Sequence, residues 1–144
     1  AVREAQEDRP LPRRSRIRGR NRDWDKGLVK PLGMTVGEVT KDRVVATLEG
    51  RPELLTTTGT VHGGTLMAFA DTIGAAGTTV NLAPGQSTAT IESKTNFFAA
   101  AFNGVVLAEA TPLHRGKRTH VWQTRVTDEN GKLLSLTIQT QVIL

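Results

Sequence analysis

The sequence contains no cysteine, which excludes several kinds of chemistry at once. Disulfides, thiolate nucleophiles and Cys-ligated metals are ruled out, and an intracellular protein becomes the default expectation. Long hydrophobic runs are also lacking, and the N-terminus is Arg-rich rather than apolar, so we predict neither a transmembrane helix nor a secretory signal. These absences favour a soluble, cytoplasmic protein that has no membrane partner.

Motifs for metal and nucleotide binding are absent as well. The three histidines, at positions 62, 114 and 120, have no metal-ligand spacing, and no glycine pattern matches a phosphate loop or a dinucleotide fingerprint. The stretch "GQSTA" at 85–89 begins like the elbow of a serine nucleophile, but it ends in alanine and lies between a helix and a strand. We therefore expect no metal and no redox or nucleotide cofactor.

What the sequence does contain is an uneven distribution of positive charge. Residues 1–30 hold ten Lys or Arg and five Asp or Glu, whereas residues 31–144 hold nine of each sign, so the net charge of +5 belongs to the N-terminal segment. This segment is rich in arginine and is predicted to be an extended or disordered arm. It lacks the interleaved aromatic residues of a nucleic-acid surface, and we expect no nucleic-acid partner. Residues 31–144 are long enough to form one domain.

The pattern of apolar residues in 31–144 indicates an α+β fold. Residues 63 to about 80 are apolar nearly all round and too numerous for one strand, which predicts a buried helix. Alternation of apolar and polar residues predicts a hairpin before this helix and four strands after it; the expected strands are 32–39, 43–50, 87–98, 104–114, 118–128 and 132–144. An antiparallel sheet of these strands must wrap around the single helix.

The predicted helix contains one acidic residue, Asp71, in the run "VHGGTLMAFADTIGAAG". A carboxylate in an apolar helix is paired, is neutralised, or acts as a base tuned by its surroundings. The alternative to a catalytic role is that Asp71 bonds a neighbouring backbone group or hydroxyl. The helix opens with Gly63 and Gly64, and backbone N–H groups at a helix N-terminus can donate to a substrate oxygen. The segment thus combines a candidate base with a candidate oxyanion donor.

The spacing of these two groups constrains the assembly. Gly63 and Asp71 are eight residues apart, so at ~1.5 Å per residue they lie roughly 12 Å apart along one helix. A base and an oxyanion donor that act on one carbonyl should each lie ~3 Å from the reacting atoms, directly or through one water. Two antiparallel helices across a two-fold axis would bring Gly63 of one subunit near Asp71 of the other. If both residues are catalytic, the protein is at least a dimer.

The run "GTVHGGTLMAFADTIGAAG", followed by "TIESKTNFFAAAFNG", "LHRGKRTHVWQTRVTDENGKL" and "QT", resembles the hotdog-fold acyl-CoA thioesterases of the phenylacetic-acid-degradation type. The resemblance covers about residues 31–144, and its most specific feature is HGG with an acidic residue nine positions after the histidine. It implies a hotdog fold, a homodimer or homotetramer, and sites at the subunit interface. It also implies a hydrolase that converts an acyl-CoA thioester to the free acid and coenzyme A, with coenzyme A present only as part of the substrate.

The resemblance also assigns roles to individual residues. Gly63 would donate its N–H to the thioester carbonyl, while Asp71 of the partner would activate water or attack directly. His62 would help to polarise or position the acyl group, and Thr90 would place a hydroxyl that faces the nucleophilic water. Thr56 stands where many members have Asn, so a carboxamide that orients substrate or water is missing, and the Thr56 hydroxyl is its candidate substitute.

Substrate-binding residues are implied at Gly64, Phe97, Arg115, Lys117 and Arg118. The three basic residues lie at a strand connection where Arg and Lys would meet the phosphates of coenzyme A, although a solvated, charge-rich hairpin has the same composition. Phe97 would line an acyl pocket, and the alternative is that it belongs to the core.

Two other functions remain open at this point. A hotdog hydratase or dehydratase that acts on enoyl thioesters would also use a histidine and an acidic residue on one helix. A non-catalytic acyl-CoA-binding module would account for Thr56 at the usual Asn position and for the basic arm.

Overall fold

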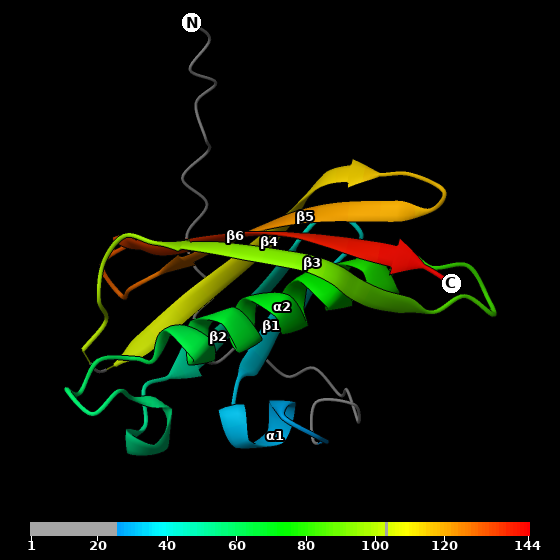
Figure 1. Ribbon diagram of the computed structural model, residues 1–144. Helices are drawn as coiled ribbons and strands as arrows, with labels where there is room; N and C mark the ends of the chain where they lie inside the picture. Colours follow the sequence, from blue (N-terminus) through cyan, green and yellow to red (C-terminus); the bar gives the residue numbers. More distant parts are fainter. Residues whose placement is uncertain (1–25, 103) are drawn as a thin grey trace, which may run out of the picture.

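A computed structural model of the protein describes residues 26–102 and 104–144, and one six-stranded antiparallel sheet curves around a single long helix (Figure 1). The strand order is β1-β2-β4-β5-β6-β3. The helix α2 (Gly63–Thr79) lies across one face of the sheet. The other elements are α1 (Val29–Leu32), β1 (Thr35–Val39), β2 (Val44–Glu49), the 3-10 helix η3 (Pro52–Leu54), β3 (Thr88–Phe97), β4 (Val105–Arg115), β5 (Thr119–Thr127) and β6 (Leu133–Ile143). This architecture confirms the predicted α+β hotdog fold.

The core forms between α2 and the inner face of the sheet. Phe69 and Ile73 of α2 are fully buried in one apolar cluster with Trp122 of β5, and burial of each large apolar side chain stabilises the fold by roughly 1.5–3 kcal/mol. The Trp122 ring packs against Gly77, where an added Cβ would lie 2.6 Å from a ring carbon. Its indole Nε1 donates to Thr78 Oγ1 at 2.9 Å. Trp122 therefore fixes the C-terminal half of α2 on the sheet.

The predicted strands and the predicted helix are all present, with ends shifted by at most three residues. The predicted basic arm lies mostly outside the described residues, which begin at Lys26. The helix α1 begins at Val29 and spans the predicted boundary between residues 30 and 31. A helix of four residues is too short to show a helical period, and the sequence pattern therefore misses it.

Strand β6 reverses the usual polarity of a half-buried strand. The side chains of Ser135, Thr137, Gln139 and Gln141 are buried on the inner face, whereas Ile138, on the outer face, is 40% exposed. Burial of a polar side chain is costly unless the group is hydrogen-bonded. These residues therefore need polar partners on the elements that cover them.

Strand β3 is an edge of the sheet. It pairs with β6 on one side only, it is ten residues long, and most of its residues are exposed. The unpaired N–H and C=O groups of a long edge strand are a template for pairing with another chain. In the described part of the chain, no helix is both long and apolar enough to cross a membrane.

Candidate active site

The first turn of α2 presents one backbone N–H that has no acceptor within the described residues. The N-cap residue His62 accepts from the Gly64 N–H through Nδ1 at 2.8 Å. Its carbonyl accepts from the N–H groups of Thr65 and Leu66 at 2.9 and 3.1 Å. The N–H of Gly63 makes no such bond. Because a helix N-terminus carries partial positive charge, this N–H is the group of the turn that can donate to a substrate oxygen.

The bond to His62 also decides what the neighbouring groups can do. Because Nδ1 accepts, the proton of the neutral imidazole resides on Nε2, and the exposed ring offers an N–H donor there. The Gly64 N–H is occupied by His62, so Gly64 contributes to the site only through its missing side chain. An added Cβ at Gly64 would lie 3.0 Å from His62 Nδ1.

Asp71 lies about two turns further along α2, and two side chains from the sheet hold one of its carboxylate oxygens. Thr90 Oγ1 donates to Oδ1 at 2.8 Å, and Gln139 Nε2 donates to the same oxygen at 3.2 Å. Behind Thr90, Gln141 Nε2 donates to Thr90 Oγ1 at 2.5 Å, and Thr88 Oγ1 donates to Gln141 Oε1 at 3.1 Å. Within residues 26–102 and 104–144, no hydrogen bond reaches Oδ2. The carboxylate is thus oriented through Oδ1, and Oδ2 is left to accept a proton from elsewhere.

The structure does not bring Gly63 and Asp71 together within one chain. They are eight residues apart on a continuous helix, which corresponds to roughly 12 Å. Asp71 contacts Thr90 near the start of β3, whereas a Cβ added at Gly63 would lie 3.1 Å from the ring of Phe97 at the end of β3. A single protomer therefore contains two separate half-sites.

The aromatic ring of Phe97 lies at the Gly63 half-site rather than in the core. Phe97 is 50% exposed, and the next two phenylalanines, Phe98 and Phe102, are 58% and 68% exposed. In the single chain, the alternative that Phe97 belongs to the core is therefore wrong. The exposed ring of Phe97 lies next to the first turn of α2, against Gly63.

Thr56 lies in the loop that leads into α2, and its hydroxyl is occupied within that loop. Thr56 Oγ1 bonds with the hydroxyls of Thr58 and Thr60 at 3.0 and 2.9 Å, and it accepts from the Thr60 N–H at 3.2 Å. The Thr56 side chain makes no bond to Gly63 or Asp71 in the described part of the protein. Thr56, Thr58 and Thr60 thus form a closed hydroxyl cluster in this loop.

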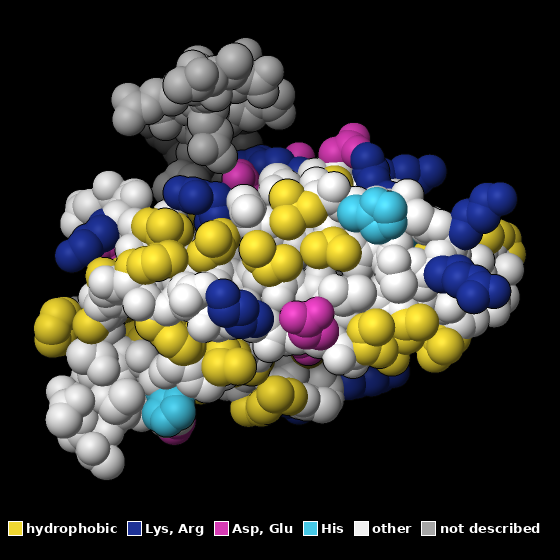
Figure 2. Space-filling view, turned by 45° about the horizontal axis from the view of Figure 1, so that its top comes forward, with side chains coloured by type: hydrophobic (Ala, Val, Ile, Leu, Met, Phe, Trp, Pro, Cys, Tyr) yellow, Lys and Arg dark blue, Asp and Glu magenta, His cyan; other side chains and the backbone are white. Residues whose placement is uncertain are grey.

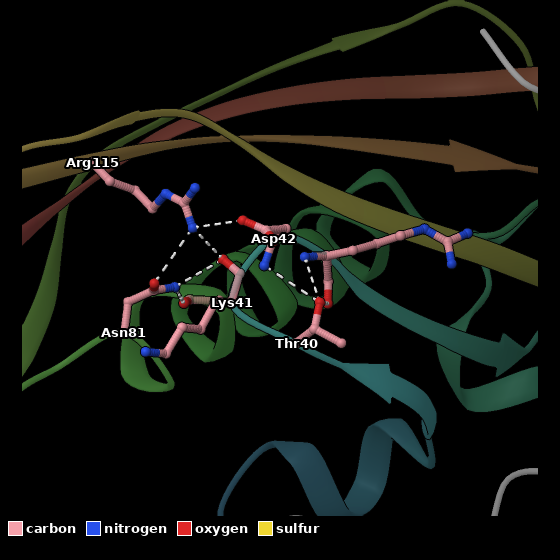
Figure 3. Close-up of polar contacts among 7 residues, drawn as sticks. Thr40, Lys41, Asp42, Asn81 and Arg115 are labelled. Carbon is pink, nitrogen blue, oxygen red and sulfur yellow. Dashed lines mark hydrogen bonds and ion pairs between the residues drawn. The ribbon is translucent and has the colours of Figure 1, made fainter.

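Arg115 belongs to a polar cluster at the far end of α2 (Figure 3). Its Nη1 donates to the Lys41 carbonyl at 2.7 Å and pairs with Asp42 Oδ1 at 2.9 Å. Asn81, just beyond α2, donates from Nδ2 to the Lys41 carbonyl at 3.0 Å and to the Gly77 carbonyl at 2.7 Å. The cluster ties the end of β4 and the β1–β2 turn to the C-terminus of α2, so Arg115 has a structural role whatever else it binds.

Lys117 and Arg118 lie in the β4–β5 connection beside this cluster. Both residues are exposed, and neither side chain forms a hydrogen bond or ion pair with the described residues. Basic side chains gather at the end of the molecule where the β4–β5 connection lies (Figures 1 and 2). This end is separated from Gly63 by the length of α2.

Sequence reasoning missed Gln139 and Gln141, which support Asp71 directly and through Thr90. The available signal was the alternation "SLTIQTQ", which places polar residues on one face of a strand and apolar residues on the other. The sequence alone does not say that the polar face points inward. A group of three or more His, Asp or Glu side chains arranged to hold a metal ion is absent from the described residues.

The sheet curves around one helix as in the hotdog fold, and this helix has a donor N–H at its start and an anchored carboxylate two turns later. The comparison of families agrees, since the model of the thioesterase superfamily matches residues 58–135. The chain belongs to the thioesterase superfamily, and it is a thioester hydrolase of the hotdog fold.

Individual relatives support the same assignment. The chain is 31% identical over 110 residues to a 1,4-dihydroxy-2-naphthoyl-CoA hydrolase of Listeria monocytogenes, a match that covers 76% of this chain and 89% of the relative. A thioesterase of Haemophilus influenzae superposes with a TM-score of 0.82 at 27% identity and covers 86% of this chain and 87% of its own. The phenylacetic acid degradation protein PaaI of Thermus thermophilus superposes with a TM-score of 0.72 at 28% identity, and the match covers 78% of this chain and 95% of the PaaI chain.

Proposed function

We propose that the protein hydrolyses acyl-CoA thioesters at two equivalent sites, each built from two copies of the chain. The observation that carries this proposal is the pair of half-sites on α2, with the unpaired N–H of Gly63 at one position and the oriented carboxylate of Asp71 eight residues later. The acyl-CoA substrate class is supported by the Listeria relative, whose name specifies a CoA thioester. The assembly is a homodimer or a homotetramer formed as a dimer of dimers.

The edge strand β3 is the surface through which the two copies would meet. Both half-sites lie along it, since Thr90 contacts Asp71 and Phe97 contacts Gly63. If two β3 strands pair in antiparallel fashion, the start of one strand lies near the end of the other. This arrangement moves Asp71 of one copy toward Gly63 of the second copy and satisfies the free edges of both sheets.

The reaction follows from the two groups. The Gly63 N–H donates to the thioester carbonyl oxygen, and Asp71 Oδ2 of the second copy takes a proton from a water whose oxygen attacks the carbonyl carbon. The negative charge that forms on the carbonyl oxygen faces the positive end of α2. The C–S bond then breaks, and the proton passes from the carboxyl group to the departing sulfur. In the direct alternative, Asp71 attacks the carbonyl carbon and the C–S bond breaks to release the thiolate; water then hydrolyses the resulting anhydride and supplies the proton that the thiolate takes up.

The coenzyme A phosphates require a basic surface some distance from the thioester. Lys117 and Arg118 meet this requirement because they lie near the C-terminus of α2, eight residues and roughly 12 Å beyond Asp71 along the helix. Arg115 is less available, since Asp42 and the Lys41 carbonyl already engage its Nη1. We therefore assign the phosphate contacts mainly to Lys117 and Arg118, and the acyl group to the exposed ring of Phe97.

The test is thiol release from aromatic, short-chain and long-chain acyl-CoAs by wild type, Asp71→Asn and the control Glu53→Gln. Because a positioned general base contributes ~10²–10⁴ in rate, Asp71→Asn should lose at least about a hundred-fold in kcat on the preferred substrate. The control removes an exposed carboxylate of η3 and should keep wild-type activity. Size-exclusion chromatography should show the same oligomer for all three proteins.

Three results would overturn the proposal. Near wild-type turnover by Asp71→Asn would remove the carboxylate from the mechanism. A change in the absorbance of an enoyl-CoA without thiol release would indicate a hydratase, and binding of acyl-CoA without any turnover would indicate a binding module.

A further inference from the structure

Gln139 of β6 is almost fully buried, with 1% of its surface exposed, and its amide lies against Asp71. Nε2 donates to two atoms of the same residue, the backbone carbonyl at 3.1 Å and the carboxylate Oδ1 at 3.2 Å. A single bond would leave the carboxylate able to rotate about its side-chain torsions. Two bonds that link the side chain and the backbone of Asp71 to one rigid amide restrict that rotation.

The Gln139 amide packs against α2 at Gly74, where the helix has no side chain. An added Cβ at Gly74 would lie 2.3 Å from Gln139 Oε1 and 2.5 Å from its Cδ, distances at which atoms cannot coexist. Glycine in a helix interior is unfavourable compared with alanine. Gly74 therefore has a local reason to be glycine, which is the close approach of the Gln139 side chain. Oε1 itself is buried and has no hydrogen-bond partner among the described residues.

A purely structural residue would not be built in this way. An apolar side chain of similar length would fill the space beneath Gly74 without burying an unpaired carbonyl oxygen, which is itself unfavourable. The unsatisfied Oε1 accompanies the one function that an apolar side chain lacks, which is donation to Asp71. Thr90, on a different strand, supplies the second donor to Oδ1.

We infer that Gln139 is a positioning residue, which together with Gly74 holds Asp71 through Oδ1 so that Oδ2 faces the reacting water or carbonyl. This inference rests on the proposed function, because it assigns Asp71 the role of base or nucleophile. Gln139 does not touch the substrate in this account. It acts through the rotamer of Asp71 and through stabilisation of the ionised carboxylate.

The experiment compares the full-length variants Gln139→Met, Gln139→Glu, Gly74→Ala and Gly77→Ala in thiol-release assays across pH. Gln139→Met keeps the length of the side chain and removes the donor. We expect kcat to fall roughly ten-fold, as for a lost hydrogen bond to a charged group, with little change in KM. The acidic limb of its pH–rate profile should move to higher pH, because one donor to the carboxylate has gone.

The other variants separate positioning from packing. Gln139→Glu places a second carboxyl against Asp71 and should move the acidic limb further than Gln139→Met, because two adjacent carboxylates resist ionisation. Gly74→Ala displaces the amide and should reproduce the effect of Gln139→Met. Gly77→Ala introduces a comparable clash, 2.6 Å from the Trp122 ring, but it does not involve Gln139, so it should lower the Tm without moving the pH profile.

The inference and the proposed function fail in different ways. If Asp71→Asn is inactive while Gln139→Met keeps the wild-type kcat and pH profile, the proposed function stands and the inference is overturned. If Gln139→Met and Gly77→Ala lower kcat equally without moving the acidic limb, the role of Gln139 is packing and the inference is again overturned. Should Gln139→Met not fold, the comparison of Gly74→Ala with Gly77→Ala gives the same decision.

Discussion

His120 lies outside the candidate site, and the fold changes its protonation. It lies on the inner face of β5 with 5% of its surface exposed, and its Nδ1 is buried without a partner among the described residues. Burial lowers the pKa of His120 below its ordinary value of 6.5, and the positive charge of Arg115 lowers this pKa further. A hydrogen bond with the Gly116 backbone acts in the opposite direction but does not prevail. The folded protein therefore favours the neutral imidazole.

This lowered pKa predicts a pH dependence of stability. As the pH falls below about 6.5, the ordinary pKa of histidine, the unfolded chain binds a proton at His120 before the folded chain does. The contribution of His120 to stability is complete above that pH and is lost as the pH falls through the lower pKa of the folded state. Thermal unfolding between pH 7.5 and 5 should show a smaller fall in Tm for His120→Gln than for wild type. Parallel pH dependence in the two proteins would contradict the prediction.

At the scale of elements, the strands and the helix follow from the sequence because each has one dominant period. The run after Gly63 is apolar on nearly every side, and α2 buries one side of its surface against the sheet, with Phe69 and Ile73 in the core. Strand β6 shows the limit of this reasoning. Its alternation predicts a strand correctly, but an apolar-inside rule would turn Gln139 and Gln141 outward, whereas both are buried.

The residues of the candidate site also fall into those that the sequence predicts and those that only the structure reveals. The sequence pointed to Gly63 and Asp71, since a carboxylate in an apolar helix and glycines at a helix start are unusual locally, whereas Thr90 was implied only by the family resemblance. The contact between Gln139 and Asp71 depends on how β6 packs against α2, because the two residues are 68 positions apart in the chain. The occupied hydroxyl of Thr56 depends on the conformation of one loop. Such contacts are tertiary, and a period along the chain does not report them.

The first turn of α2 also allows a substitution that removes one N–H donor and leaves the helix intact. Gly63 is the first helical residue, where proline is well tolerated, and its N–H has no partner to lose among the described residues. The preceding residue, His62, has φ −63 and ψ 137, a conformation that suits a residue before proline. Gly63→Pro therefore removes the proposed oxyanion donor with little disturbance of the helix. Gly63→Ala is its matched control, because it adds a Cβ near Phe97 and keeps the N–H.

At the scale of the whole molecule, the charges on β3 favour a register centred on Ser93 for the proposed dimer. Glu92 and Lys94 lie on the same face of the strand, opposite Thr140 and Ile138 of β6, and Ser93 lies between them on the other face. If two β3 strands pair in antiparallel fashion with the two-fold axis at Ser93, Glu92 of each copy lies opposite Lys94 of the other copy. An axis at Lys94 would instead place two lysines opposite each other, which is destabilising.

This register predicts a charge-swap result. Glu92→Lys should weaken the dimer, because it sets two cations opposite each other, and the double variant Glu92→Lys with Lys94→Glu should restore it. Analytical ultracentrifugation at low salt gives the dissociation constants. Because the chain has no native cysteine, Ser93→Cys supplies an independent check, since residues opposite each other across such an axis are close enough for a disulfide. An unchanged dissociation constant in Glu92→Lys would contradict this register.

The central claim is that Gly63 and Asp71 act together only across two chains, and subunit complementation tests it most directly. Gly63→Pro and Asp71→Asn, each inactive alone, would be co-expressed with different affinity tags, and the protein carrying both tags would be purified. One of its two sites combines the intact Gly63 of one chain with the intact Asp71 of the other, so a doubly tagged dimer should recover about half of the wild-type kcat. If this hybrid releases no thiol while the Gly63→Ala control is active, the result would contradict a shared site and place both residues in the site of one chain.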